Sequence, residues 1–197
     1  SVEEEYSLPK DLEWSAAVGL KKETGMTPAE RGDNAIDTFP WGDQWPPPFR
    51  TGNFKVRESP DFDRETSSVD KFQTNKVGLF GMAGNVSEWC LDKMGNGTQF
   101  QVVRGGYWGA SQKGQLRSGN RIGLPAKLSS AGIGFRPVYV PKISDRKSPE
   151  IAKPEKPVYP PPSGASLGTP WQNSLSMQLV PAVGQTNALF SAYETRV

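Results

Sequence analysis

The side chains available for chemistry are few. The chain contains no histidine and a single cysteine, Cys90. Histidine is the usual general base near neutral pH and the commonest nitrogen ligand of transition metals. Serine-histidine and cysteine-histidine hydrolases are therefore excluded, as are zinc or iron sites built on imidazole. One cysteine cannot form an internal disulfide, so the redox compartment stays open.

Carboxylates are the remaining groups that could act as acid and base. Asp61, Asp63, Glu65 and Glu88 are candidates, because glycosidases use a pair of such groups. Cys90 follows a tryptophan directly in an apolar run, which favours an inert core thiol over a reactive one.

The composition predicts one folded but loop-rich domain with an appendage. Only 35% of the 197 residues are hydrophobic, and glycine (21) and proline (18) are abundant. Six tryptophans and nine phenylalanines, however, argue against disorder, because such side chains need burial.

The charge pattern argues against two classes of partner. A net charge of +2 with interspersed signs indicates no nucleic acid. The acidic beginning does not match a secretory signal, and no apolar run reaches the ~20 residues of a membrane helix. We therefore expect a soluble chain without a signal or membrane segment, of unknown localisation.

The pattern along the chain predicts few regular elements. We expect one helix, an ordered aromatic loop, three short antiparallel strands, a proline-rich linker and two tail strands. In that order they are residues Tyr6–Lys22, Thr27–Thr74, Val86–Leu91, Gln99–Arg104, Gly134–Val140, Pro141–Gly168, Met177–Pro181 and Ala188–Tyr193.

Five ordered motifs carry a family resemblance. Residues 78–89, GLFGMAGNVSEW, resemble the signature "GLYDMxGNVWEW" of the formylglycine-generating-enzyme, or sulfatase-modifying-factor, family. The run VRGGYW at 103–108, the pair Arg117 and Arg121, and IGFR at 133–136 match its "RGGSW … R … R … GFR" ending. Upstream, residues 6–14 resemble "RLPTEAEWE" and residues 39–43 the "YPWG" turn.

The resemblance implies an α+β, irregular, loop-rich, C-type-lectin-like fold with small antiparallel sheets and few helices. It divides the chain into the major C-terminal part of a family domain (1–140), a proline-rich linker (141–168) and a segment resembling a domain's opening strands (169–197). In this chain the segment that resembles the opening strands comes last. This order is that of a circular permutation, or of a fragment that spans two tandem domain copies such as bacterial relatives contain. We expect the tail to dock on residues 1–140 or to swap into a homodimer.

The resemblance also implies that the enzymatic function is lost. Oxidase members of the family bind copper through two cysteines, whose places fall here on Ala110 and Gln115, and Tyr107 replaces the serine of "RGGS". Soft Cu(I) needs sulfur ligands, so no copper is expected. The iron-dependent sulfoxide synthases of the family use histidines, which this chain lacks.

Calcium is the cofactor that the resemblance leaves open. One implied site consists of Asn85, the Val86 carbonyl and Glu88. The other consists of Asn53, the Phe54 carbonyl, Asp61 and the Asp63 carbonyl. Hard cations favour such mixed oxygen ligands. The alternative is that these groups merely cap turns.

Three functions remain open. The first is a non-catalytic structural or binding module for a protein or peptide, with contacts from Tyr107, Trp108, Lys113 and Arg117 in the loop 106–132. The second is a formylglycine-generating oxidase acting on a sulfatase cysteine, which the missing cysteines disfavour. The third is a stable fragment without an evolved function of its own. We expect Arg104, Arg117, Arg121 and Arg136 to satisfy buried carbonyls rather than a substrate.

Overall fold

The chain was analysed as a computed structural model. The structure describes residues 5–34, 37–56 and 62–140, and the backbone of four strands further on, at 171–172, 178–181, 189–191 and 195–196. Within these residues, no helix has the length and apolar character needed to cross a membrane.

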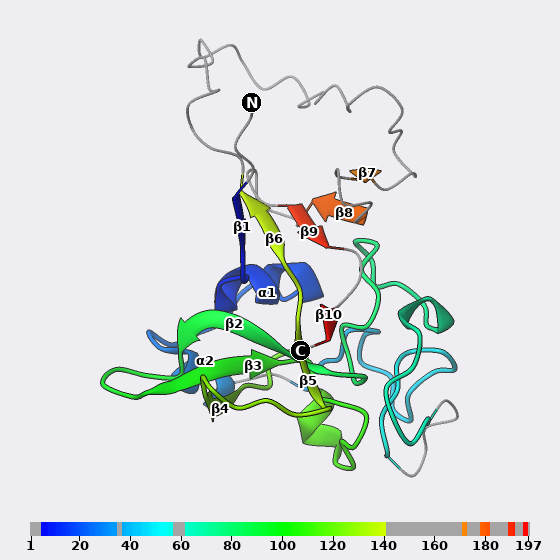
Figure 1. Ribbon diagram of the computed structural model, residues 1–197. Helices are drawn as coiled ribbons and strands as arrows, with labels where there is room; N and C mark the ends of the chain where they lie inside the picture. The colour runs from blue at the N-terminus through cyan, green and yellow to red at the C-terminus, as the bar shows by residue number, and fades with distance from the viewer. Residues whose placement is uncertain are drawn as a thin grey trace, which may run out of the picture.

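The described elements are short and alternate with long loops (Figure 1). In chain order they are β1 (Glu5–Ser7), α1 (Asp11–Val18), α2 (Pro28–Asp33), the 3-10 turn η1 (Val69–Lys71), β2 (Ser87–Lys93), β3 (Phe100–Arg104), the 3-10 turn η2 (Lys113–Leu116), β4 (Ile122–Pro125), β5 (Ile133–Phe135), β6 (Val138–Val140), β7 (Trp171–Gln172), β8 (Gln178–Pro181), β9 (Leu189–Ser191) and β10 (Thr195–Arg196).

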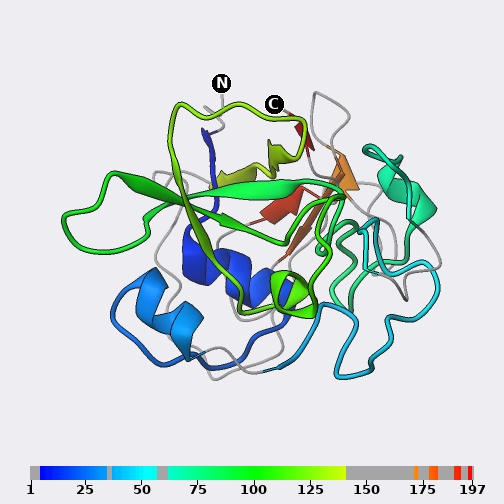
Figure 2. The ribbon, with the colours of Figure 1, turned by 90° about the horizontal axis from the view of Figure 1, so that it is seen from below.

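The strands form two five-stranded sheets. One has the order β1-β6-β9-β8-β7, and the other has the order β10-β5-β2-β3-β4. Pairing is antiparallel except between β2 and β5, where Ser87 lies opposite Ile133 in parallel. Viewed from below, β2 and β3 run beside α1 (Figure 2). The expected mixture of few helices and small, mostly antiparallel sheets is therefore confirmed.

The first helix is shorter than the predicted Tyr6–Lys22. Tyr6 belongs instead to β1, where it pairs with Tyr139 of β6. The helix ends at Gly19, whose φ of 96° is the left-handed conformation that closes many helices. The helix also buries a charged residue and exposes an apolar one, because Asp11 is fully buried whereas Leu12 is 53% exposed.

A second helix, α2, was missed by the sequence analysis. Its beginning is a capping box: the Thr27 hydroxyl accepts from the Glu30 amide, the Glu30 side chain returns to the Thr27 amide, and Pro28 occupies the first turn. Thr-Pro-Ala-Glu is the usual sequence sign of such a helix start. The signal was therefore present, but it lay in a segment expected to be loop.

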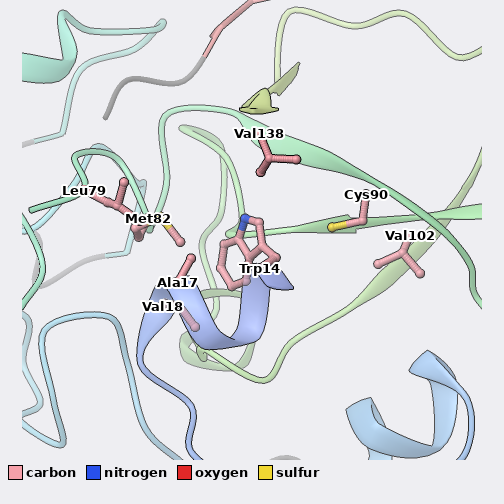
Figure 3. Close-up of a cluster of buried hydrophobic side chains, with 8 residues drawn as sticks. All are labelled: Trp14, Ala17, Val18, Leu79, Met82, Cys90, Val102 and Val138. Carbon is pink, nitrogen blue, oxygen red and sulfur yellow. The ribbon is translucent and has the colours of Figure 1, made fainter. Parts of the chain in front are cut away.

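The main apolar core lies where α1 meets both sheets. Figure 3 shows Trp14 of α1 with Cys90 of β2, Val102 of β3 and Val138 of β6 around it. A second cluster is aromatic and includes Phe39, Phe54, Ala110 and Leu116, with Trp41, Trp45 and Tyr107 packed against it. The loop 37–56 is thus ordered by its aromatic residues, as expected.

A buried ionic cluster lies beside the apolar core. Asp11 is fully buried and binds three arginines. Its carboxylate lies 3.0 Å from Arg31 Nη2 and 2.9 Å from Arg121 Nε, and it also pairs with Arg104 Nη1. Burial alone would raise the pKa of Asp11, but the three guanidinium groups hold it below its ordinary value. This carboxylate connects α1 to α2, to β3 and to the segment before β4.

A second buried ion pair joins the same helix to the second sheet. Glu88 of β2 lies 2.6 Å from Arg136 Nη2 and accepts a hydrogen bond from Trp14 Nε1 at 2.8 Å. Arg104 also stacks over Trp14, with its guanidinium carbon 4.4 Å from the ring centroid. As expected, the buried arginines act structurally; Arg104 donates to the carbonyls of Asn120 and Ser118.

The tail strands extend both sheets. Strand β9 pairs with β6, with Phe190 opposite Val138, and β10 pairs with β5, with Thr195 opposite Phe135. Strands β8 and β9 lie within the two predicted tail segments. The predicted linker at 141–168 lies outside the described residues, so the domain division, the circular permutation and the strand swap stay predictions.

We predict that Asp11→Asn lowers the free energy of unfolding by about 3 to 5 kcal/mol, because three buried arginines lose their common counter-charge. Urea unfolding followed by tryptophan fluorescence would measure the loss. The matched control is Asp33→Asn, the same change at an exposed carboxylate of α2, which should stay within about 0.5 kcal/mol. Equal effects of the two substitutions would contradict the central role of Asp11.

The same cluster predicts that the free energy of unfolding falls at acid pH. A carboxyl whose pKa is lower in the folded state stabilises the fold above its unfolded pKa of about 3.9, and this contribution is lost as pH falls through the folded pKa. The difference in unfolding free energy between wild type and Asp11→Asn should therefore be constant near neutral pH and narrow below about pH 4. A difference that stays constant down to about pH 3 would refute this.

Candidate functional site

The two positions aligned with the oxidase cysteines have structural contacts. Ala110 is fully buried in the aromatic cluster, and its carbonyl accepts from the Lys55 amide at 2.8 Å. The Gln115 side-chain oxygen accepts from the amides of Ser111 and Gln112, both at 3.0 Å. Neither side chain can act as a thiolate ligand.

Cys90 lies elsewhere, in the main apolar core with Trp14 and Val102 (Figure 3). It is fully buried, and burial raises the pKa of its thiol. A protonated, enclosed thiol is a poor nucleophile and a poor metal ligand. The expectation of an inert core cysteine agrees with this setting.

Lys113 and Arg117, two of the four predicted contact residues, meet at one carboxylate. Asp37 Oδ2 lies 2.6 Å from Lys113 Nζ, and Asp37 Oδ1 lies 2.9 Å from Arg117 Nε. All three side chains are between 40% and 47% exposed. Hydrogen bonds from Lys113 and Arg117 lower the pKa of Asp37, so the carboxylate stays ionised at neutral pH.

This ionic group lies on aromatic rings. Lys113 Nζ is 5.5 Å from the ring centroids of both Phe39 and Trp45, within the range of a cation-π contact. We call Asp37, Phe39, Trp45, Lys113 and Arg117 the Asp37 surface. Asp37 was missed by the sequence analysis, because 76 residues separate it from Lys113 and no local motif marks it.

The other two predicted contact residues, Tyr107 and Trp108, are neighbours in the chain. Tyr107 packs against the aromatic cluster, and its ring lies against Gly109 and Gly132. Trp108 contacts the Tyr107 ring edge-on at 5.9 Å between centroids, and its amide donates to the Asn85 carbonyl at 3.0 Å. Tyr107 therefore packs against the same aromatic cluster as Phe39, whereas the backbone of Trp108 is bonded to that of Asn85.

The asparagines of the two predicted calcium sites form a clamp. The Asn85 amide donates to the Asn53 carbonyl at 2.7 Å. The side-chain oxygen of Asn53 accepts from the Asp63 amide at 2.9 Å, and that of Asn85 accepts from the Ser67 amide at 2.7 Å. These contacts hold the loop 63–67 against the segment before β2.

The remaining predicted calcium ligands are dispersed. Val86 and Phe54 are fully buried, and Glu88 is paired with Arg136 as described. The Asp63 carboxylate lies 2.6 Å from Lys71 Nζ, while Asp61 lies outside the described residues. Among the described residues no group of three or more histidine, cysteine or acidic side chains could hold a metal ion. Both calcium sites stay predictions.

Comparison with known proteins identifies the family. The family model "Sulfatase-modifying factor enzyme 1-like domain" matches residues 2–140, which is most of the chain, so the chain belongs to this family. The resemblance read from the motifs is thereby confirmed.

Three similar proteins illustrate the range of relatives. "Chaperone protein LppX" of Paenibacillus barcinonensis is 25% identical over 134 residues, covering 66% of this chain and 46% of that protein. "Formylglycine-generating enzyme" of Thermomonospora curvata is 33% identical over 92 residues, covering 43% and 26%. "Treponema denticola variable protein 1" has a similar structure with a TM-score of 0.50 and 21% identity, covering 70% and 49%.

These matches cover only part of each relative. The chain spans less than half the length of the curated relatives it matches. The structural likeness shows the fold, which is C-type-lectin-like with few helices, as the motifs implied.

We predict that the asparagine clamp depends on Gly84. A Cβ there would overlap the Asn53 carbonyl oxygen, and its φ is 73°. Gly97 has nearly the same φ, 71°, but a Cβ there meets nothing within 4 Å. Gly97→Ala should therefore cost about 1 kcal/mol of unfolding free energy, and Gly84→Ala roughly 3 kcal/mol or more. Equal losses in thermal or urea unfolding would show that the close approach is unimportant.

Proposed function

We propose that this chain is a non-catalytic formylglycine-generating-enzyme-like domain that binds a protein or peptide through the Asp37 surface. The observation that carries the proposal is the pairing of Lys113 and Arg117 on one ionised carboxylate, with Lys113 over the buried ring of Phe39 and the partly exposed ring of Trp45. Aromatic residues and arginine supply most of the binding energy in protein interfaces.

The arrangement of this surface reduces the entropic cost of binding. Asp37 restrains both long cationic side chains, and the rings of Phe39 and Trp45 restrain Lys113 further. Phe39 stacks on Trp41 at 4.9 Å between centroids and packs against Trp45 at 5.3 Å. A ligand that contacts such a surface immobilises fewer free rotamers than one that contacts isolated lysines.

Two of the relatives favour different functions. One relative carries the name of a chaperone, which agrees with a role in contacting other proteins. The relative named as a formylglycine-generating enzyme supports the competing function, oxidation of a sulfatase cysteine. We disfavour the oxidase because Ala110 and Gln115 stand at the aligned positions and the chain has one cysteine, which is buried.

We predict no oxidation of a thiol substrate. The purified chain, loaded with Cu(I), should consume no oxygen and form no aldehyde with a cysteine-containing sulfatase peptide, as measured with an oxygen electrode and by mass spectrometry. An active formylglycine-generating enzyme is the positive control. Any copper-dependent aldehyde product would overturn the non-catalytic part of the proposal.

We predict that the chain selects ligands from a library of displayed random dodecapeptides, and that the selected peptides lose binding to the double variant Lys113→Ser/Arg117→Ser. The matched control is Lys93→Ser/Lys127→Ser, which removes the same charge at two exposed lysines. Failure to enrich any binder, or equal loss in both double variants, would reject the Asp37 surface as a binding site.

A further inference from the structure

The charges of the Asp37 surface do not balance. One carboxylate serves two cations, so Asp37, Lys113 and Arg117 together carry one surplus positive charge. The segment that supplies the cations has no acidic residue from Lys93 to Ser144. Of its four cations between 106 and 132, Arg121 is neutralised in the core by Asp11 and Glu23, whereas Lys127 is exposed.

The guanidinium of Arg117 is presented with one edge in use. Its ion pair within the described residues runs through Nε to Asp37. This pair orients the planar group and leaves the edge formed by the two terminal nitrogens for a ligand. Two parallel N–H groups match the two oxygens of a carboxylate, which is why arginine binds carboxylates in a bidentate manner.

The neighbouring rings select a second feature of the ligand. Trp45 is partly exposed beside Lys113, and Trp41 is partly exposed beside Phe39. Trp41 donates its indole hydrogen to the Gln44 carbonyl at 3.0 Å, so this polar group is already satisfied and the rest of its ring is apolar surface. A ligand with an acidic group next to an apolar side chain would match both parts of the surface.

We propose that the Asp37 surface binds an acidic peptide: a carboxylate of the ligand pairs with the free edge of Arg117 and with Lys113, and an adjacent apolar side chain packs on Trp45. This inference rests on the proposed function and specifies its ligand class. Asp37 is a positioning residue that holds both cations toward the ligand.

Three fluorescein-labelled dodecapeptides test this proposal. They share one pattern of apolar residues and carry glutamate, glutamine or lysine at every other position. Fluorescence anisotropy with the full chain should show the glutamate peptide binding at least about tenfold more tightly than the glutamine peptide. The preference should weaken as salt is raised, because the charges are exposed.

Substitutions at Arg117 and Lys127 distinguish the effect of the guanidinium geometry on peptide binding from the effect of net charge. Arg117→Gln should weaken the glutamate peptide about tenfold, and Arg117→Lys should restore only part of the loss, because an ammonium cannot form the bidentate pair. Lys127→Gln, which removes the same charge from the same segment, should have little effect. Equal weakening by Arg117→Gln and Lys127→Gln would reduce the binding to general electrostatics and overturn the proposal.

The remaining outcomes distinguish this inference from the proposed function. Tighter binding of the lysine peptide, or equal binding of all three peptides through the Asp37 surface, would overturn the acidic ligand and leave the binding function in place. If the displayed library yields no ligand and none of the three peptides binds, both the binding function and the acidic ligand are rejected.

Discussion

The fold depends on one buried carboxylate. Asp11 lies at the start of α1 and pairs with Arg31 of α2, Arg104 of β3 and Arg121 before β4, and Glu23 adds a second negative charge at Arg121. Burying these guanidinium groups without their shared carboxylate would cost several kcal/mol, so Asp11 is the main charge that lets these elements pack on one another. The apolar core of α1, β2 and β3 is small, and this ionic cluster supplies a fixed geometry that packing alone would specify less well.

The same cluster explains how two arginines of one loop acquire different roles. Arg121 is drawn into the core by Asp11 and Glu23, and its anchoring fixes one end of the loop. Nearer the middle, the Ser118 amide donates to the Thr38 carbonyl at 2.8 Å, which holds the loop against the segment carrying Asp37. Arg117 therefore faces solvent beside Asp37. The expectation that all four motif arginines are structural holds for the buried ones but not for the contacts of Arg117.

The sequence predicted the family, the fold class and the strands β2, β3, β8 and β9, because those features are encoded in local runs such as GNVSEW and VRGGYW. The single strand predicted at Gly134–Val140 divides instead between β5 and β6, which belong to different sheets. The sequence did not predict the interactions that join these runs. Asp11 and Arg121 are 110 residues apart, and Asp37 and Arg117 are 80 apart. A charged residue in a helix pattern normally indicates a solvent-facing position, whereas Asp11 of α1 is fully buried. The helix α2 was missed although its capping box is present in the sequence, because it lies in a segment expected to be loop.

The loop that the motifs align with the oxidase cysteines is packed with side chains. Tyr107 stands where the motif of the family has serine, and its ring occupies space that two glycines leave free. A Cβ at Gly109 would lie 2.5 Å from that ring, and a Cβ at Gly132 would lie 2.7 Å from it. Ala110 beside it is enclosed by Phe39, Phe54 and Leu116. Side-chain packing thus surrounds Ala110, one of the two positions that the motifs align with the oxidase cysteines, whereas Asp37, Lys113 and Arg117 are partly exposed. Such an arrangement favours recognition at the surface, because a ligand can reach the cations and the rings without entering the interior.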